Sequence, residues 1–105
     1  MSTLPGTWDL DLSTPIGTLH VRYVFAVTPD GIEGTAASDR ETVVLSNIAI
    51  TSAAEGERVT WEQRVTKPMR LNLAFDVIVE GDTMTGHSRA GRLPRTSVVG
   101  TRVVA

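Results

Sequence analysis

Three residues within the apolar segments carry polar groups that could do chemistry in a folded core: Tyr23, Trp61 and Gln63. Tyr and Trp each join a flat apolar body to a polar tip, and Gln offers both a hydrogen-bond donor and an acceptor. Such groups can hydrogen-bond a substrate carbonyl, and an indole can stack on a reacting π-system. Core hydrogen bonds or bound water would satisfy the same groups without catalysis. These three residues are therefore the candidate catalytic residues, with a structural role as the alternative.

Other kinds of catalytic site find little support in the residue types. The sequence has no cysteine, which excludes thiolate ligands and Cys nucleophiles. His20 and His87 are out of phase with their apolar neighbours, and Asp9 and Asp11 are expected to point outward into solvent. No phosphate-binding loop or dinucleotide fingerprint occurs. Without a His pair or an inward carboxylate cluster, we expect no metal and no cofactor.

Length and charge limit which classes of protein and function remain. The 105 residues predict one domain, spanning 1–105. A net charge of −2 without a basic stripe argues against nucleic-acid binding. No segment approaches the roughly 20 apolar residues of a membrane helix, and the N-terminal residues lack the regions of a signal peptide. A chain without cysteine fits a reducing compartment, so we expect a cytoplasmic protein.

Alternation of apolar and polar residues with period two dominates the chain and predicts β-strands throughout. Turn signals such as Pro29-Asp30-Gly31 and Gly81-Asp82 separate the strands. A break or β-bulge near Ser46-Asn47 is expected inside the fourth strand. The eight strands expected cover residues 7–12, 19–27, 32–38, 42–53, 58–66, 71–79, 83–90 and 96–104.

The two halves of the chain are similar to each other. Trp8 and Trp61 are 53 residues apart, and Pro15 and Pro68 repeat this spacing. Each half, 6–53 and 58–105, is expected to form a four-stranded meander, and two meanders can bury one apolar face between them. Glycines inside strands favour a barrel over a sandwich of two sheets. The expected fold class is all-β, an eight-stranded antiparallel up-and-down β-barrel built from two four-stranded repeats.

The richer apolar face of each strand is expected to line the barrel lumen. Leu19 and Val27 fall on this face near the two ends of the second strand. Outward apolar residues could form a homodimer surface, namely Val24, Ala26, Ala74 and Ile78. If the lumen holds a ligand, the expected ligand-binding residues are Tyr23, Phe25, Trp61, Gln63, Phe75 and Met84, with Ile16 and Met69 as lid residues on one rim.

The first and last strands of a closed barrel must be neighbours. Gly6-Thr7-Trp8 begins the first strand and Thr101-Arg102 lies in the last, so Arg102 could stack on the Trp8 indole and close one end. This pair resembles the signature of the calycins, the group of lipocalins, fatty-acid-binding proteins and avidins. The hairpins and turns are similar to those of small bacterial lipocalin-like domains. A weaker resemblance is to allene oxide cyclase and the spirotetronate Diels–Alderases.

These resemblances imply two functions. The first is a binding module that holds a small apolar, unsaturated molecule in the lumen. The alternative is a cofactor-free cyclase or isomerase of natural-product biosynthesis that acts in the same cavity. A third interpretation, from the chain's own residues, is a barrel filled by side chains that serves as an interaction domain. No nucleic acid and no membrane are expected as partners.

Overall fold

The computed structural model describes residues 4–14, 17–39, 41–65 and 70–103. These residues form strands and turns, without a helix. None of them could therefore cross a lipid bilayer as a helix. The nine strands are β1 (Gly6–Thr14), β2 (Gly17–Thr28), β3 (Gly31–Ala37), β4 (Thr42–Val44), β5 (Ser46–Ala53), β6 (Gly56–Val65), β7 (Leu71–Glu80), β8 (Thr83–Arg89) and β9 (Thr96–Arg102).

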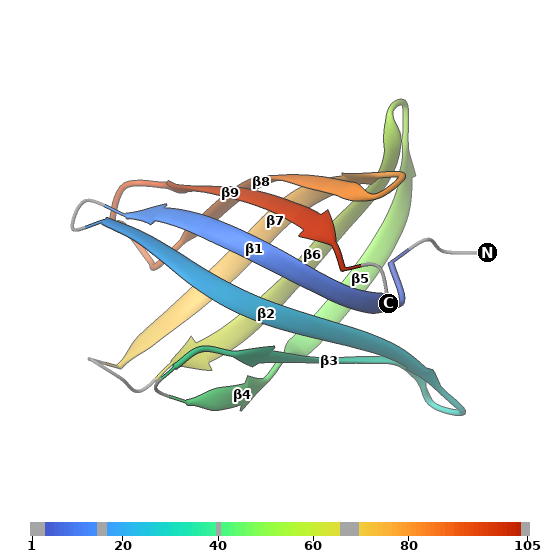
Figure 1. Ribbon diagram of the computed structural model, residues 1–105, viewed down its shortest axis with the longest axis horizontal. Coiled ribbons are helices and arrows are strands. Elements are labelled where there is room, and N and C mark those ends of the chain that lie inside the picture. The colour runs from blue at the N-terminus through green and yellow to red at the C-terminus, as the bar shows by residue number, and fades with distance from the viewer. Residues whose placement is uncertain (1–3, 15–16, 40, 66–69, 104–105) are drawn as a thin grey trace.

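All strand pairs are antiparallel and form one sheet in the order β4-β3-β2-β1-β9-β8-β7-β6-β5. The sheet curls into a nearly closed barrel, and β1 and β9 lie side by side in its wall (Figure 1). The all-β antiparallel barrel is therefore confirmed. One end of the barrel is called the distal end. β1, β3, β6 and β8 finish there. The duplication of the two halves stays a prediction.

The prediction of eight strands was wrong by one, because the expected strand 42–53 is divided at Leu45. Asn47 adopts a left-handed backbone with φ of 53°. The register between β5 and β6 shifts between Ser46 and Ala49. A residue in this conformation bends the chain and interrupts pairing. The predicted break near Ser46-Asn47 is confirmed, and it produces the additional strand.

The seam of the barrel lies at this break. β4 and β5 are the two edges of the sheet, and Leu45 between them donates its N–H to the Gly34 carbonyl of β3 at 2.9 Å. The Leu45 side chain is buried in the core. A Cβ atom on Gly34 would lie 2.8 Å from Leu45 Cδ1. It would also lie 2.9 Å from Phe25 Cδ1, so a larger residue at Gly34 would force the side chains of Leu45 and Phe25 to shift.

The residues predicted to face inward form the core, but the core does not extend to the ends of the strands. Leu19 is 50% exposed and Val27 is 73% exposed, although both were expected in the lumen. Each lies within a few residues of a hairpin turn, where few strands remain to cover it. The buried apolar residues are Leu4, Trp8, Leu10, Leu12, Tyr23, Phe25, Ala36, Leu45, Val59, Trp61, Phe75, Val77, Val79, Met84 and Val98.

The outward apolar residues do not form the single surface expected for a homodimer. Val24 and Ala26 lie on β2, whereas Ala74 and Ile78 lie on β7. Between these strands the sheet places β1, β9 and β8. The two pairs therefore occupy separate parts of the wall.

Charged residues on the outer wall pair across neighbouring strands. Asp9 accepts hydrogen bonds from both Nε and Nη2 of Arg22, at 2.9 and 3.2 Å. Two residues farther along β1, Asp11 contacts His20 of β2. Both carboxylates point outward as predicted. Contact with solvent is not their only interaction, because each carboxylate also has a partner on the neighbouring strand.

The predicted rim residues Pro15, Ile16, Pro68 and Met69 lie outside the described residues. Their shared rim and the lid role of Ile16 and Met69 stay predictions.

Candidate functional site

One end of the barrel, here called the Trp8 end, is built around a buried indole. Trp8 lies directly opposite Arg102 in the pairing of β1 with β9. The guanidinium carbon of Arg102 is 4.4 Å from the indole ring centroid. Trp8 Nε1 donates to the Leu4 carbonyl at 2.8 Å, and Leu4 is fully buried. The predicted cation–π contact is confirmed, whereas Leu4 was not predicted as a core residue.

Arg102 also joins the backbone and the neighbouring hairpin at this end. Its Nη1 donates to the Pro5 carbonyl at 2.8 Å, and its Nε donates to Asp82 Oδ1 at 2.8 Å. A Cβ atom on Gly6 would lie 2.7 Å from Arg102 Nη1, and Gly6 has a φ of +136°. Glycine is needed there for both space and backbone conformation. The Gly-x-Trp and Thr-Arg residues thus form one structural unit.

Next along the lumen is a level filled by aromatic rings. Trp61 and Phe75 stack with centroids 4.9 Å apart. Tyr23 lies 5.6 Å from Trp61, and Phe25 lies 5.4 Å from Trp61. These residues are all buried, as is Met84. The inward placement predicted for them is confirmed, but the rings pack on one another, so side chains occupy this level.

Gln63 lies beside the rings and accepts two hydrogen bonds on one atom. The Tyr23 hydroxyl donates to Gln63 Oε1 at 2.7 Å, and Trp61 Nε1 donates to the same oxygen at 3.1 Å. An indole N–H can only donate, which fixes which end of the carboxamide is the oxygen. The three candidate catalytic residues thus lie together in one hydrogen-bonded network.

Gln63 lies two residues before the distal end of β6. Among the described residues, none accepts a hydrogen bond from Gln63 Nε2. The same part of the chain contains no buried side-chain nitrogen or oxygen without a partner. Gln63 keeps an exposed fraction of 5%, so Nε2 is the atom that meets solvent. Leu73 lies opposite Gln63 in the pairing of β6 with β7, and it is an apolar residue that is only partly buried. Val21, two residues before Tyr23 on β2, is partly buried as well.

Burial controls the chemistry of Tyr23. Desolvation raises the pKa of its hydroxyl well above the ordinary value, and the hydrogen bond to Gln63 opposes this only in part. The phenol therefore stays protonated at physiological pH and directs its proton to Gln63. Neither Tyr23 nor Trp61 has a second polar hydrogen to offer a substrate.

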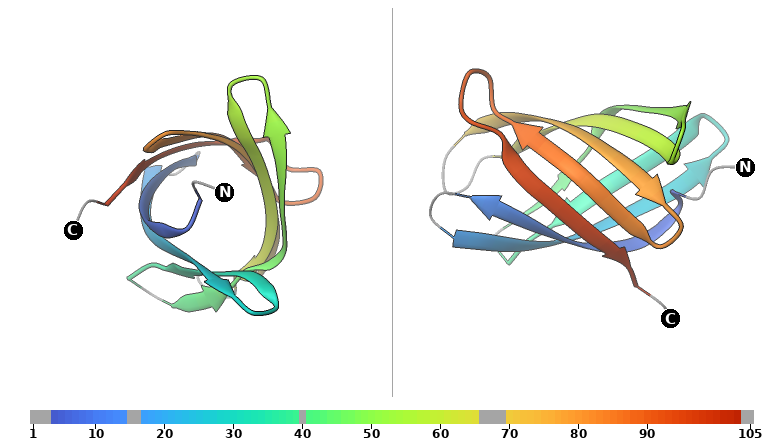
Figure 2. Two further views of the ribbon diagram at one scale, coloured as in Figure 1. Left: turned by 90° about the vertical axis from the view of Figure 1, so that its right-hand side faces the viewer. Right: turned by 90° about the horizontal axis from the view of Figure 1, so that it is seen from above.

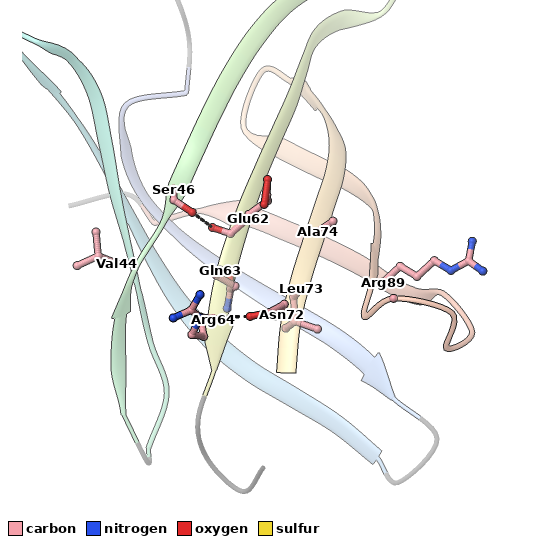
Figure 3. A pocket seen from close by; sticks show the side chains of 10 residues that line it. Val44, Ser46, Glu62, Gln63, Arg64, Asn72, Leu73, Ala74 and Arg89 are labelled. Atoms are coloured by element: carbon pink, nitrogen blue, oxygen red, sulfur yellow. Dashed lines mark hydrogen bonds between the residues drawn. The ribbon is translucent and has the colours of Figure 1, made fainter. Parts of the chain in front are cut away.

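The outer wall carries shallow hollows that differ from the predicted apolar cavity. One, of about 400 Å³, lies across β6 and β7 near the seam (Figure 3). Its polar residues bond to each other: Arg64 Nε donates to Asn72 Oδ1 at 3.3 Å, and Ser46 Oγ donates to the Glu62 carbonyl at 3.4 Å. The hollow is lined by Val44, Ser46, Glu62, Gln63, Arg64, Asn72, Leu73, Ala74, Arg89 and Gly91.

A second hollow, of about 420 Å³, lies on the outer wall of β5 to β8 and includes His87 and Asp76. Arg58 donates to Asp76 through Nε at 2.9 Å and holds the pKa of that carboxyl below its usual range. The charge of His87 nearby lowers it further. The described residues contain no group of three or more His, Cys, Asp or Glu that could hold a metal ion.

Comparison with known proteins adds no family to this description. A scan against protein-family models finds no match to the chain. A search of curated proteins finds no match either. The resemblance to calycins therefore stays a prediction, and the site must be interpreted from its own geometry.

Proposed function

We propose that the protein is a binding module for a small, mainly apolar and unsaturated molecule that carries a carbonyl or hydroxyl group. The ligand would occupy the distal end of the barrel, above the level of aromatic rings. The lumen at the level of the rings is filled, so the ligand would rest on Gln63 and not among Phe25 and Met84.

The observation that carries this proposal is the orientation of Gln63. Its oxygen is held by two donors, which leaves its Nε2 group, near the distal end of β6, to donate to another partner. Leu73, opposite Gln63 on β7, is apolar and only partly buried. A few placed polar groups among apolar side chains are typical of small-molecule sites. A carbonyl oxygen is the natural partner of an N–H donor in such surroundings.

The cyclase or isomerase alternative would use the same site, but the hydrogen bonds favour binding. Catalysis by Tyr23 or Trp61 requires a proton that each now donates to Gln63. Only the Gln63 amide remains to polarise a substrate carbonyl. One neutral amide donor can orient a ligand, whereas larger rate effects usually need several converging donors.

The test is a titration with β-ionone, an unsaturated ketone, followed by Trp fluorescence. We expect saturable binding, and weaker binding of limonene, an unsaturated hydrocarbon without an acceptor. Gln63→Leu should weaken β-ionone binding by about 1–3 kcal/mol and leave limonene binding nearly unchanged. Equal effects of Gln63→Leu on both compounds would contradict the role given to the amide. No binding of either compound would favour the interaction-domain interpretation.

The cytoplasm stays the proposed location. The chain has no cysteine and so needs no oxidising compartment.

A further inference from the structure

β5 is an edge strand that the fold leaves uncovered on one side. The described residues pair it with β6 alone, and it ends the sheet opposite β4. Its hairpin with β6 extends beyond the ring of strands, and the β2–β3 hairpin points away from it (Figure 2). An uncovered edge presents a row of backbone groups that can pair with another strand.

The pairing with β6 indicates which backbone groups are available. A two-residue loop joins Ala53 to Gly56, so these residues form the hydrogen-bonded pair that closes the hairpin. Hydrogen-bonded and non-hydrogen-bonded pairs alternate along an antiparallel ladder. Ile50 and Ser52 oppose Val59 and Glu57 at non-hydrogen-bonded positions. Their N–H and C=O groups therefore point away from β6, toward the uncovered side.

The composition of β5 lacks the usual protection of an edge. Its eight residues, Ser46–Ala53, include no charged residue and no proline. Natural edge strands commonly carry Lys, Pro or inward charges that prevent pairing with another chain. The other edge, β4, has only three residues and offers little to pair with.

We propose that two copies of this chain associate through antiparallel pairing of their β5 strands. The available groups allow the register in which Ile50 of one copy lies opposite Ile50 of the second copy, on a two-fold axis, and the proposal commits to this register. Residue 48 then pairs with 52, and residue 49 with 51. No like charges meet in this arrangement, because the strand is uncharged. Such an interface uses the same patch on both copies, as two-fold dimers do.

The first test is the molar mass in solution, measured by light scattering during size-exclusion chromatography. We expect twice the mass of one chain. Ser52→Pro removes an N–H that points away from β6, so it should spare the hairpin and yield the monomer. Val44→Pro is the matched control on the other edge and should stay dimeric. Circular dichroism verifies that each variant is folded. A monomeric parent protein, or a Ser52→Pro variant that stays dimeric, would overturn the proposal.

The second test fixes the register through cysteines, since the chain has none of its own. Hydrogen-bonded pairs place Cα atoms about 5.5 Å apart, within reach of a disulfide. Ile50→Cys should therefore form a covalent dimer under mild oxidation. Thr51→Cys on the same strand, and the exposed Thr85→Cys on β8, should cross-link at least several-fold less. Equal cross-linking of all three variants would contradict the two-fold axis at Ile50.

Discussion

At the Trp8 end, Arg102 contacts an indole, a backbone carbonyl and a carboxylate, and the Trp8 N–H is bound by Leu4. At the distal end, the Gln63 oxygen is equally well bound, but its nitrogen faces solvent among partly covered apolar residues. Each of the two networks joins a Trp to a long polar side chain. They differ in whether a donor remains for a molecule from outside.

This difference separates stability from function. A polar group fully bound within the protein holds neighbouring elements together, and its removal costs folding free energy. A donor held in a fixed orientation without a protein acceptor contributes to recognition instead. We therefore expect changes at the Trp8 end to act on stability alone, and changes at Gln63 to act on both stability and binding.

The largest effect is expected from Trp8→Ala. The indole is fully buried, so its removal leaves a cavity and exposes the Arg102 stem. The free energy of unfolding should fall by about 3–5 kcal/mol. Urea denaturation measures this value, and Trp8→Phe should show a smaller loss because a ring remains. A loss below about 1 kcal/mol for Trp8→Ala would mean that this end does not anchor the barrel.

Gln63→Leu should destabilise the barrel by about 1–3 kcal/mol, because it leaves the Tyr23 hydroxyl and the Trp61 N–H buried without an acceptor. The second substitution Tyr23→Phe should restore part of that loss by removing the stranded hydroxyl. Denaturation of the single and double variants forms a cycle that isolates the coupling. Independent, additive losses would show that the hydrogen bond between these side chains is unimportant.

Arg102→Ala should lower the free energy of unfolding by about 1–3 kcal/mol through loss of stacking on Trp8. Arg102→Lys keeps the charge but loses the planar stack. Its free energy of unfolding should lie between those of the parent protein and Arg102→Ala. Affinity for β-ionone should not change, because the distal end is intact. A loss of affinity comparable to that of Gln63→Leu would break the separation between the ends.

The smallest effect concerns the outer wall. Arg58 keeps the pKa of Asp76 below its ordinary value. A lowered folded-state pKa gives stability that is present above the ordinary Asp pKa and disappears as pH falls through the lowered one. Asp76→Asn should therefore lower stability at neutral pH and have less effect near pH 2. Urea denaturation at both pH values tests this, and an equal effect at both would contradict the ion pair.

The period-two pattern was sufficient to predict the barrel, the inward placement of Tyr23, Trp61 and Gln63, and the stacking of Arg102 on Trp8. Strand phase determines all of these, and phase is visible in the sequence. The division at Leu45 was only partly visible, because Asn47 tolerates the left-handed conformation without requiring it.

Other features depend on distances between residues in the folded chain, which the alternation of apolar and polar residues does not determine. Leu4 lies before the first alternating segment, so nothing in the sequence indicates that the chain folds back to cover Trp8. The convergence of Tyr23 and Trp61 on one oxygen of Gln63 depends on side-chain reach across the lumen. The exposure of Leu19 and Val27 reflects where each strand passes the end of the barrel.

The most direct measurement of the contrast between the ends uses the side-chain amide of Gln63. It is the only glutamine in the sequence, so its two N–H signals can be identified by ¹⁵N-glutamine labelling. On titration with β-ionone, we predict that both signals shift in a saturable manner, while the indole N–H signal of Trp8 stays in place. An unchanged Gln63 amide at saturating ligand, or an equal shift of the Trp8 signal, would contradict a ligand site at the distal end.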